Sequence, residues 1–226
     1  MAALPAIDAL VPFKRFDQAK ERLAALLSPP EREALARLLL AEALQALAGT
    51  PSIRRTVLVT SDAGAAALAG EHGAGTLPEP AGVRGLNPAL EAARRAILGG
   101  AEPPDALLVL HADIAGLDPA AIEEFVTDGA PAPLVRLCPA RDEGTNALLL
   151  RPPDLIPFRY GPRSAPAHEA EAHTAGARFE RRIVVALRDD LDTPADVERL
   201  LRSGRGGAAA ALLRSFGVER RLAHRL

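Results

Sequence analysis

The chain has 226 residues, of which 48% are hydrophobic, 25% charged and 3% aromatic, and its formal net charge is −2. This balance is typical of one globular domain, and it excludes a nucleic-acid-binding protein that depends on basic excess or aromatic stacking. No apolar run has membrane-spanning length, and no basic segment precedes an apolar core at the start, so we expect neither a membrane span nor a secretory signal. The single Cys138 excludes an internal disulfide and is typical of the cytoplasm, which is the expected location.

Continuous apolar runs predict buried strands, and capping residues followed by apolar residues at helical spacing predict helices. In chain order, we expect a strand at 6–13, a helix from the Ser28 cap to Gly49, a strand at 53–61, a helix at 62–71, a helix capped by Asn87 with Pro88 at its first position, a strand at 106–110, a helix from the Asp118 cap to Phe125, strands at 134–137 and 146–150, a helix at 164–174, a strand at 182–187 and a helix at 193–201.

This alternation of strands and helices predicts an α/β fold over residues 1–203, with a mostly parallel sheet covered by helices on both faces. A glycine-rich break at 203–207 precedes a basic tail helix at 208–226, so the tail, residues 204–226, is set apart. Such a tail is typical of a packing or dimerisation element, and a homodimer is one expectation. Because ligands bind at the carboxyl ends of parallel strands, Lys14, Ser61 and Asp113 are expected to be neighbours.

A cluster of cations follows the first expected strand. Lys14, Lys20 and Arg22 suit a polyphosphate that lies against the edge of the sheet, although a solvated basic loop is the alternative for each of them. The region contains no Gly-x-x-x-x-Gly-Lys-Ser/Thr, which excludes a Walker-type loop. It also contains no Gly-x-Gly-x-x-Gly, which argues against a nicotinamide dinucleotide fold.

Two carboxylates are candidate metal ligands. Asp113 ends the strand at 106–110, and Asp192 lies in the downstream segment Asp190-Leu191-Asp192-Thr193-Pro194. Mg²⁺ in proteins takes one or two carboxylates together with substrate phosphates, so this pair would suffice. Asp192 also suits a helix cap, and the two roles are compatible.

Two further segments could contact a small ligand. Gly85-Leu86-Asn87 is a glycine loop that enters a helix, where backbone groups can hold a ribose or a base, although a plain capped helix is the alternative. Thr145, Gly161 and Ser164 lie in segments rich in arginine and small residues. They suit a pocket for a small phosphorylated anion, and a strand, a proline-rich turn and a capped helix are the alternative.

The histidines and serines do not indicate a hydrolase. None of the serines lies in a Gly-x-Ser-x-Gly elbow. No pair of histidines has the spacing of a metal site, and most of the five are expected at the surface: His72, His111, His168, His173 and His224.

Taken in order, these segments resemble the 2-phospho-L-lactate guanylyltransferase family of coenzyme F-420 biosynthesis. The most specific part is Gly-Thr-Asn-Ala-Leu with the downstream Phe-x-x-Gly-x-x-Ser. The matching pieces are Val11-Pro12 with Lys14, Ala19-Lys20 with Arg22-Leu23, Gly85-Leu86-Asn87 with Ala89-Leu90, Ala112-Asp113, Gly144-Thr145-Asn146-Ala147-Leu148, Phe158 with Gly161 and Ser164, and Asp192-Thr193-Pro194 with Asp196. Four positions depart from the family pattern: Phe13, Pro88, Ala115 and Ala165.

The resemblance implies a single-domain, three-layer nucleotidyltransferase fold like that of the nucleotide-diphospho-sugar transferases. It also implies GTP, Mg²⁺ and a three-carbon phosphorylated acid as acceptor, namely 2-phospho-L-lactate, phosphoenolpyruvate or 3-phospho-D-glycerate. The implied roles are contact with the triphosphate for Lys14, Lys20 and Arg22, metal binding for Asp113 and Asp192, and acceptor binding for Thr145, Gly161 and Ser164. Pro12, Gly85 and Asn87, together with Ser61 at the second strand end, are the expected nucleotide-binding residues.

Two other functions remain open on the sequence. One is a nucleotidyltransferase with a sugar-phosphate or molybdopterin-type acceptor, although the segment Phe13 to Asp17 lacks the glycine-rich loop that such enzymes usually carry. The other is a non-catalytic nucleotide-binding scaffold that has kept the fold.

Overall fold

The computed structural model describes residues 5–80, 82, 84–127 and 130–223. Its strands are β1 (Ile7–Pro12), β2 (Ile53–Val59), β3 (Gly75–Leu77), β4 (Ala106–Leu110), β5 (Leu134–Pro139), β6 (Thr145–Arg151) and β7 (Arg178–Arg181). Its helices are the 3-10 turns η1 (Phe16–Gln18) and η2 (Glu21–Leu23) and the helices α1 (Pro29–Ala48), α2 (Ala63–Glu71), α3 (Leu86–Leu98), α4 (Pro119–Val126), α5 (Ser164–Thr174), α6 (Val185–Arg188), α7 (Pro194–Ser203), α8 (Gly207–Ser215) and α9 (Val218–Ala223).

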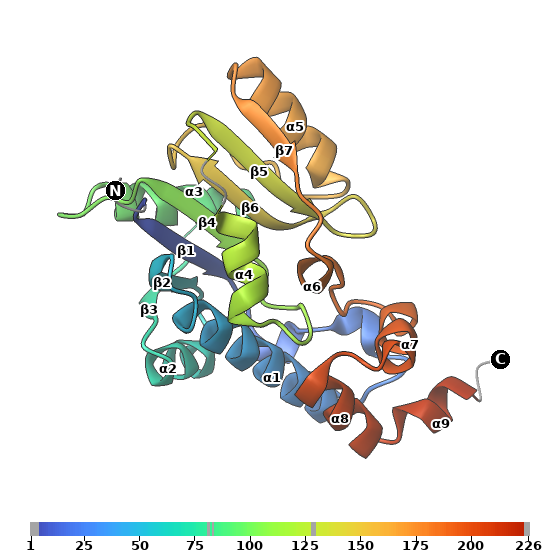
Figure 1. Ribbon diagram of the computed structural model, residues 1–226. Coiled ribbons are helices and arrows are strands. Elements are labelled where there is room, and N and C mark those ends of the chain that lie inside the picture. Colours follow the sequence, from blue (N-terminus) through green and yellow to red (C-terminus); the bar gives the residue numbers. More distant parts are fainter. Residues whose placement is uncertain (1–4, 81, 83, 128–129, 224–226) are drawn as a thin grey trace.

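The described strands form one sheet in the order β3-β2-β1-β4-β6-β5-β7 (Figure 1). Only β6 runs antiparallel to both of its neighbours, and the other pairs are parallel. The central strands β1, β4 and β6 are buried along nearly their whole length, which explains their continuous apolar sequences. The expected mostly parallel sheet is confirmed.

Helices cover both faces of this sheet. One face packs on α1, α2, α4 and α6, and the other packs on α3 and α5, which gives the three expected layers. No helix among the described residues is both long enough and apolar enough to cross a membrane. The parallel strands β1, β2 and β4 all end at the same edge, and loops from this edge supply the residues considered below.

The strand predictions at 6–13, 53–61, 106–110, 134–137 and 146–150 are confirmed, with ends that shift by at most two residues. The predicted strand at 182–187 is wrong. The last strand is β7, and part of the predicted range forms α6 instead. The apolar sequence of residues 182–187 is misleading, because Ile183 and Val185 are about half exposed, at 51% and 52%. The polar strand β7, in contrast, pairs with β5 at the edge of the sheet.

The expected cap of α3 is also wrong. The helix begins at Leu86, its N-cap is Gly85, and Pro88 is its third residue. The side chain of Asn87 is bonded instead to the backbone of Tyr160, far away in the sequence. Asn87 is a residue type that commonly caps helices, which is why the local pattern suggested a cap. Its side chain makes a tertiary contact instead.

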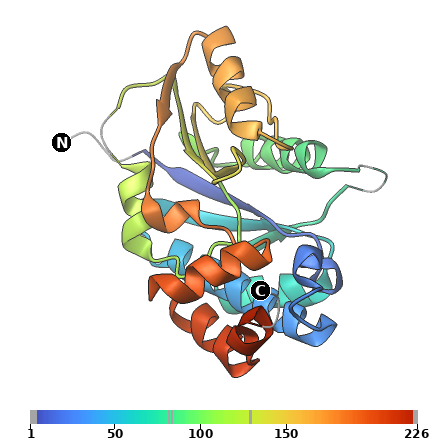
Figure 2. The same ribbon diagram turned by 90° about the vertical axis from the view of Figure 1, so that its right-hand side faces the viewer.

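The tail forms two helices, α8 and α9, rather than the one expected helix, because Gly217 interrupts it with a positive φ of 70°. Residues 224–226 of the expected helix lie outside the described part. Apolar residues of α8 and α9 share a buried cluster with α1 and α7, and the red tail in Figure 2 lies against this side of the molecule.

Glu31 ties the end of the tail to the start of α1. Its carboxylate accepts hydrogen bonds from the backbone and hydroxyl of Ser28, at 2.8 and 2.9 Å, and forms an ion pair with Arg221 of α9 at 2.7 Å. The bond from Arg221 is the main reason that the pKa of Glu31 is lowered to about 2, since burial opposes the shift. Glu31 therefore stabilises both the helix start and the packing of the tail.

Replacing Glu31 with Gln tests this tie. A lowered carboxylate pKa gives stability that is present above the ordinary pKa and disappears as the pH falls toward the folded value, here from about 4.5 to about 2. We expect Glu31→Gln to reduce the free energy of unfolding at pH 7 by at most about 1 kcal/mol, because the ion pair with Arg221 is lost while the amide oxygen can still accept from Ser28. Urea unfolding at several pH values should also show a smaller acid-dependent loss in the variant. Glu33→Gln, whose carboxylate is about half exposed beside Arg37, is the matched control, and an equal effect there would contradict the assignment.

Candidate functional site

A pocket of about 200 Å³ lies at the carboxyl ends of β1 and β4. The residues around it include most of those expected there, Pro12, Lys14, Lys20, Asp113 and Asp192, together with His111, which was not expected at the site. Arg22 lines an adjoining surface recess together with Lys20 and Asp192. The sheet edge thus brings the early cations and the two expected carboxylates into one place. Ser61 is exposed after β2 and is not among the lining residues.

Lys20 is the centre of the charged cluster. Its Nζ donates to Asp113 Oδ2 at 3.2 Å and to Asp192 Oδ1 at 2.9 Å, and only 7% of its side chain is exposed. Burial alone lowers the pKa of Lys20, but attraction to the two carboxylates outweighs it, so the pKa is raised and the amine is charged. Its backbone has φ 55° and ψ 36°, the left-handed conformation, at the start of η2.

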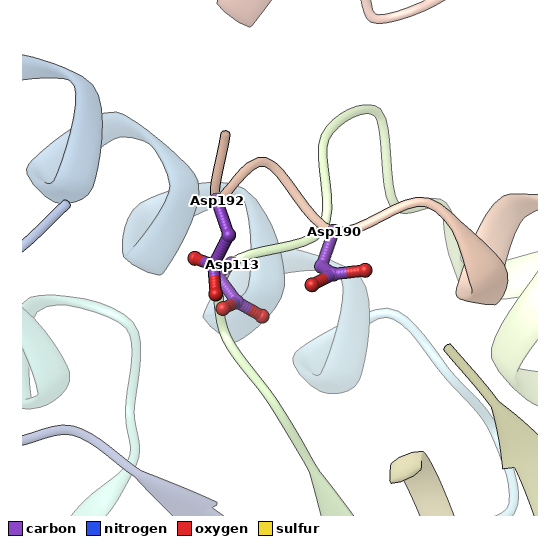
Figure 3. Close-up of side chains that lie close together, drawn as sticks. All are labelled: Asp113, Asp190 and Asp192. Carbon is purple, nitrogen blue, oxygen red and sulfur yellow. The ribbon is translucent and has the colours of Figure 1, made fainter. Parts of the chain in front are cut away.

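A third carboxylate, Asp190, joins this pair. Carboxylate oxygens of Asp113, Asp190 and Asp192 all lie within 4.8 Å of one another, and Figure 3 shows the three side chains gathered together. The loop of Asp190 is held beside β4 because Leu191 donates its backbone N–H to the Asp113 carbonyl at 3.0 Å. Burial, and then repulsion from Asp113 and Asp192, raises the pKa of Asp190 to about 6.

The spacing of the two aspartates in the sequence carries a signal for this third carboxylate. Asp190 and Asp192 are two residues apart, so in an extended segment their side chains leave on the same side. The expected cap role of Asp192 falls to its neighbour: Thr193 is the N-cap of α7, and Asp196 completes the capping box. The carboxylate of Asp192 contacts Lys20 instead.

The polar residues of the 145–164 region form a second, buried cluster. Ser164 Oγ lies 2.9 Å from Thr145 Oγ1, which in turn lies 3.1 Å from His168 Nδ1. His168 is fully buried, against the expectation for most histidines, and burial lowers its pKa to about 4. Gly161 lies nearby in sequence with φ 152°, and a Cβ added there would meet no atom within 4 Å, so the chain leaves open space at this position.

The loop before α5 is fixed from α3. Asn87 Nδ2 donates to the Tyr160 carbonyl at 2.9 Å, and the Tyr160 N–H donates to Asn87 Oδ1 at 2.7 Å. One turn later, Glu91 accepts from the N–H of Phe158 at 3.1 Å. The expected nucleotide-binding residue Asn87 is therefore directed toward the loop that leads to Ser164.

Aromatic rings connect the two clusters. The Tyr160 ring lies 5.2 Å from His111 and 4.9 Å from His168, measured between centroids. Within the described residues, three buried polar atoms at this junction have no hydrogen-bond partner: Asp113 Oδ1, His111 Nε2 and Tyr160 Oη. Buried polar atoms are normally paired, so these three atoms need a partner from outside the described chain, such as a water molecule, an ion or a ligand.

Solved structures share this fold. A protein from Desulfovibrio desulfuricans G20 that is assigned to the nucleotide-diphospho-sugar transferases superposes with a TM-score of 0.76 at 17% identity, covering 96% of this chain and 97% of that one. A nucleotidyl transferase from Methanothermobacter thermautotroptrophicus gives a TM-score of 0.59 at 18% identity, covering 93% and 99%. At these identities the similarity shows the fold alone, and it confirms the expected nucleotidyltransferase fold.

Relatives with higher identity are guanylyltransferases. The phosphoenolpyruvate guanylyltransferase of Nocardia farcinica is 37% identical over 94% of this chain and 92% of its own. The 2-phospho-L-lactate guanylyltransferase of Natrialba magadii is 37% identical over 93% and 92%, and the 3-phospho-D-glycerate guanylyltransferase of Colwellia psychrerythraea is 36% identical over 84% and 89%. The profile of the family described as "Guanylyl transferase CofC like" matches residues 7–225. With this match over nearly its whole length, the chain belongs to the CofC-like guanylyl transferase family.

Proposed function

We propose that the protein transfers GMP from GTP to the phosphate of a small three-carbon acid and releases pyrophosphate. The acceptors to consider are the acids in the names of its relatives, phosphoenolpyruvate, 2-phospho-L-lactate and 3-phospho-D-glycerate. By the family resemblance, the product would enter coenzyme F-420 biosynthesis, in the cytoplasm. The observation that carries the proposal is the cluster of Asp113, Asp190 and Asp192, of which Asp113 and Asp192 contact Lys20 and line the pocket together with Lys14.

The charges of this cluster suit a divalent cation. Three carboxylates and one ammonium group leave about two negative charges near pH 7, which a divalent ion would balance. Carboxylate oxygens are the ligands that Mg²⁺ prefers, and the buried Asp113 Oδ1 has no partner among the described residues. We therefore assign Mg²⁺ binding to Asp113, Asp190 and Asp192. When bound, the ion would neutralise negative charge on the phosphates of the nucleotide.

The proposed reaction needs no general base from the protein. A phosphomonoester has its second pKa near 6, so the acceptor phosphate is largely dianionic at pH 7 and can attack directly. The new bond joins an acceptor phosphate oxygen to the α-phosphorus of GTP, and the bond between that phosphorus and the bridging oxygen of pyrophosphate breaks. The protein must then hold the reactants in line and neutralise charge. Lys14, Lys20 and Arg22 would stabilise the leaving pyrophosphate.

The acceptor phosphate is proposed to lie at the start of α5. The positive end of the helix dipole favours an anion there, although the N–H of Ala165 already donates to the Glu143 carbonyl, and Thr145 and Ser164 add hydroxyl groups. Gly161 leaves room for it. Pro12, Ser61 and Gly85 are proposed for the nucleotide. Asn87, which was expected to bind the nucleotide, can instead influence the acceptor by holding Tyr160.

The first prediction from this proposal concerns turnover itself. We expect pyrophosphate release when the protein is mixed with GTP, Mg²⁺ and one of the three acids, and none when Mg²⁺ is removed with a chelator. The same mixture with CTP or UTP is the control for the nucleotide. Binding of GTP without pyrophosphate release for any of the acids would favour the scaffold function and reject this proposal.

The second prediction concerns the third carboxylate. We expect Asp190→Asn to weaken Mg²⁺ binding by roughly 100-fold, because loss even of a group that only supports a metal ligand costs about 10- to 100-fold. Titration calorimetry with Mg²⁺, and turnover measured against Mg²⁺ concentration, would show the change. Asp189→Asn is the matched control, since the neighbouring Asp189 pairs with Arg141 and lies outside the cluster. Equal affinity for Mg²⁺ in wild type and Asp190→Asn would remove Asp190 from the site.

The third prediction separates two roles for Asn87. Asn87→Ala removes two hydrogen bonds to the loop of Tyr160, each of which contributes about 0.5–1.5 kcal/mol. If Asn87 acts by fixing this loop, the KM for the acceptor should rise about tenfold, while the KM for GTP changes little. A rise confined to the KM for GTP would show instead that Asn87 contacts the nucleotide directly.

A further inference from the structure

His168 lies directly behind the hydroxyl pair of Thr145 and Ser164. It is on α5, one turn after Ser164, and it is fully buried. The edge of the Tyr160 ring packs against it, with centroids 4.9 Å apart. Its two ring nitrogens face different partners: Nε2 faces the backbone N–H of Arg159 at 3.0 Å, and Nδ1 faces Thr145 Oγ1 at 3.1 Å.

These partners determine which nitrogen of His168 carries the proton. A backbone N–H can only donate, so the bond from Arg159 requires an unprotonated Nε2. Burial lowers the pKa of the ring to about 4, so the ring is neutral at pH 7 and its single proton lies on Nδ1. This nitrogen is therefore the donor in its contact with Thr145.

The direction of that bond fixes the hydroxyl groups. Thr145 Oγ1 accepts from His168 Nδ1–H and from the hydroxyl of Ser164 at 2.9 Å. Its own proton then has no acceptor within the described residues. If the Thr145 hydroxyl donates to Ser164 instead, the Ser164 proton is the one left over. In either arrangement the pair keeps one O–H available for an outside acceptor.

We propose that His168 is a positioning residue that orients the Thr145–Ser164 hydroxyl pair so that it donates to the phosphate of the acceptor. This inference rests on the proposed function, since it assumes that an acceptor phosphate binds at the start of α5. With a proton on Nε2 instead, Nδ1 would accept from Thr145, and the pair would lose the hydroxyl proton that the phosphate needs. The protein enforces the other form through the Arg159 backbone.

Two substitutions separate orientation from packing. His168→Leu fills the space without a donor, whereas His168→Asn places an amide N–H close to the position of Nδ1. We expect the leucine variant to raise the KM for the acceptor about tenfold, the effect of losing one well-oriented buried hydrogen bond, with the KM for GTP within about twofold of wild type. The asparagine variant should recover most of this loss. His173→Asn, an exposed histidine on the same helix, is the control.

Binding of inorganic phosphate, measured by calorimetry on the same variants, reports the site without turnover. It should weaken in His168→Leu and Thr145→Val and recover in His168→Asn. Thermal unfolding of each variant checks that the fold is intact. Equal losses of affinity for GTP and phosphate, or no recovery in the asparagine variant, would show a purely structural role and overturn the proposal.

Nitrogen-15 NMR of the histidines of the wild-type protein gives a readout that does not depend on the reaction. We expect His168 to show the neutral form protonated at Nδ1 throughout pH 5.5–8. The form protonated at Nε2 would overturn the proposal even if the protein is a guanylyltransferase. If no acid is turned over but the tautomer and the phosphate affinities follow the expectation, the orienting role stands and only the proposed reaction fails.

Discussion

The contact of one lysine with two aspartates holds the site together. Lys20 lies between Asp113 and Asp192, which are 93 and 172 residues away in the sequence. It therefore fixes the loop after β1, the end of β4 and the segment before α7 relative to one another. Without its charge, the cluster with Asp190 would place three carboxylates within 4.8 Å of one another with no compensating cation in contact, which like-charge repulsion disfavours. The buried ammonium group, which contacts Asp113 and Asp192, offsets this repulsion at the edge of the pocket.

Much of the fold could be predicted because its central strands are apolar on both faces. The runs at 106–110 and 146–150 are buried from end to end, so their sequences carry a strong signal. Edge elements carry a weak one: β3 has three residues, and the polar β7 pairs only with β5 among the described strands. The apolar Ile183 and Val185 misled the prediction because their exposure depends on where the chain leaves the sheet, which no local pattern records.

The site was predictable where topology alone brings residues together, as for Lys14 and Asp113 at neighbouring strand ends. It was not predictable where a side chain makes one specific long-range contact. Asn87 suggested a local cap, but it binds the backbone of Tyr160. Most histidines were expected at the surface, but His168 lies buried behind Thr145. Such contacts depend on the relative placement of α3, α5 and β6, which a periodic pattern does not specify.

The left-handed backbone of Lys20 has an evolutionary consequence. A residue with a Cβ pays about 1–2 kcal/mol in this conformation, whereas glycine adopts it freely. Selection for folding alone would therefore favour glycine at this position, and only the need for an ammonium group opposes it. A related chain that carries glycine here would gain from the relieved backbone only if the carboxylates at the positions of Asp113 and Asp192 had also been lost, since they would otherwise repel each other without the ammonium group. The residue at this position thus indicates whether a member of the family is maintained for its chemistry or only for its fold.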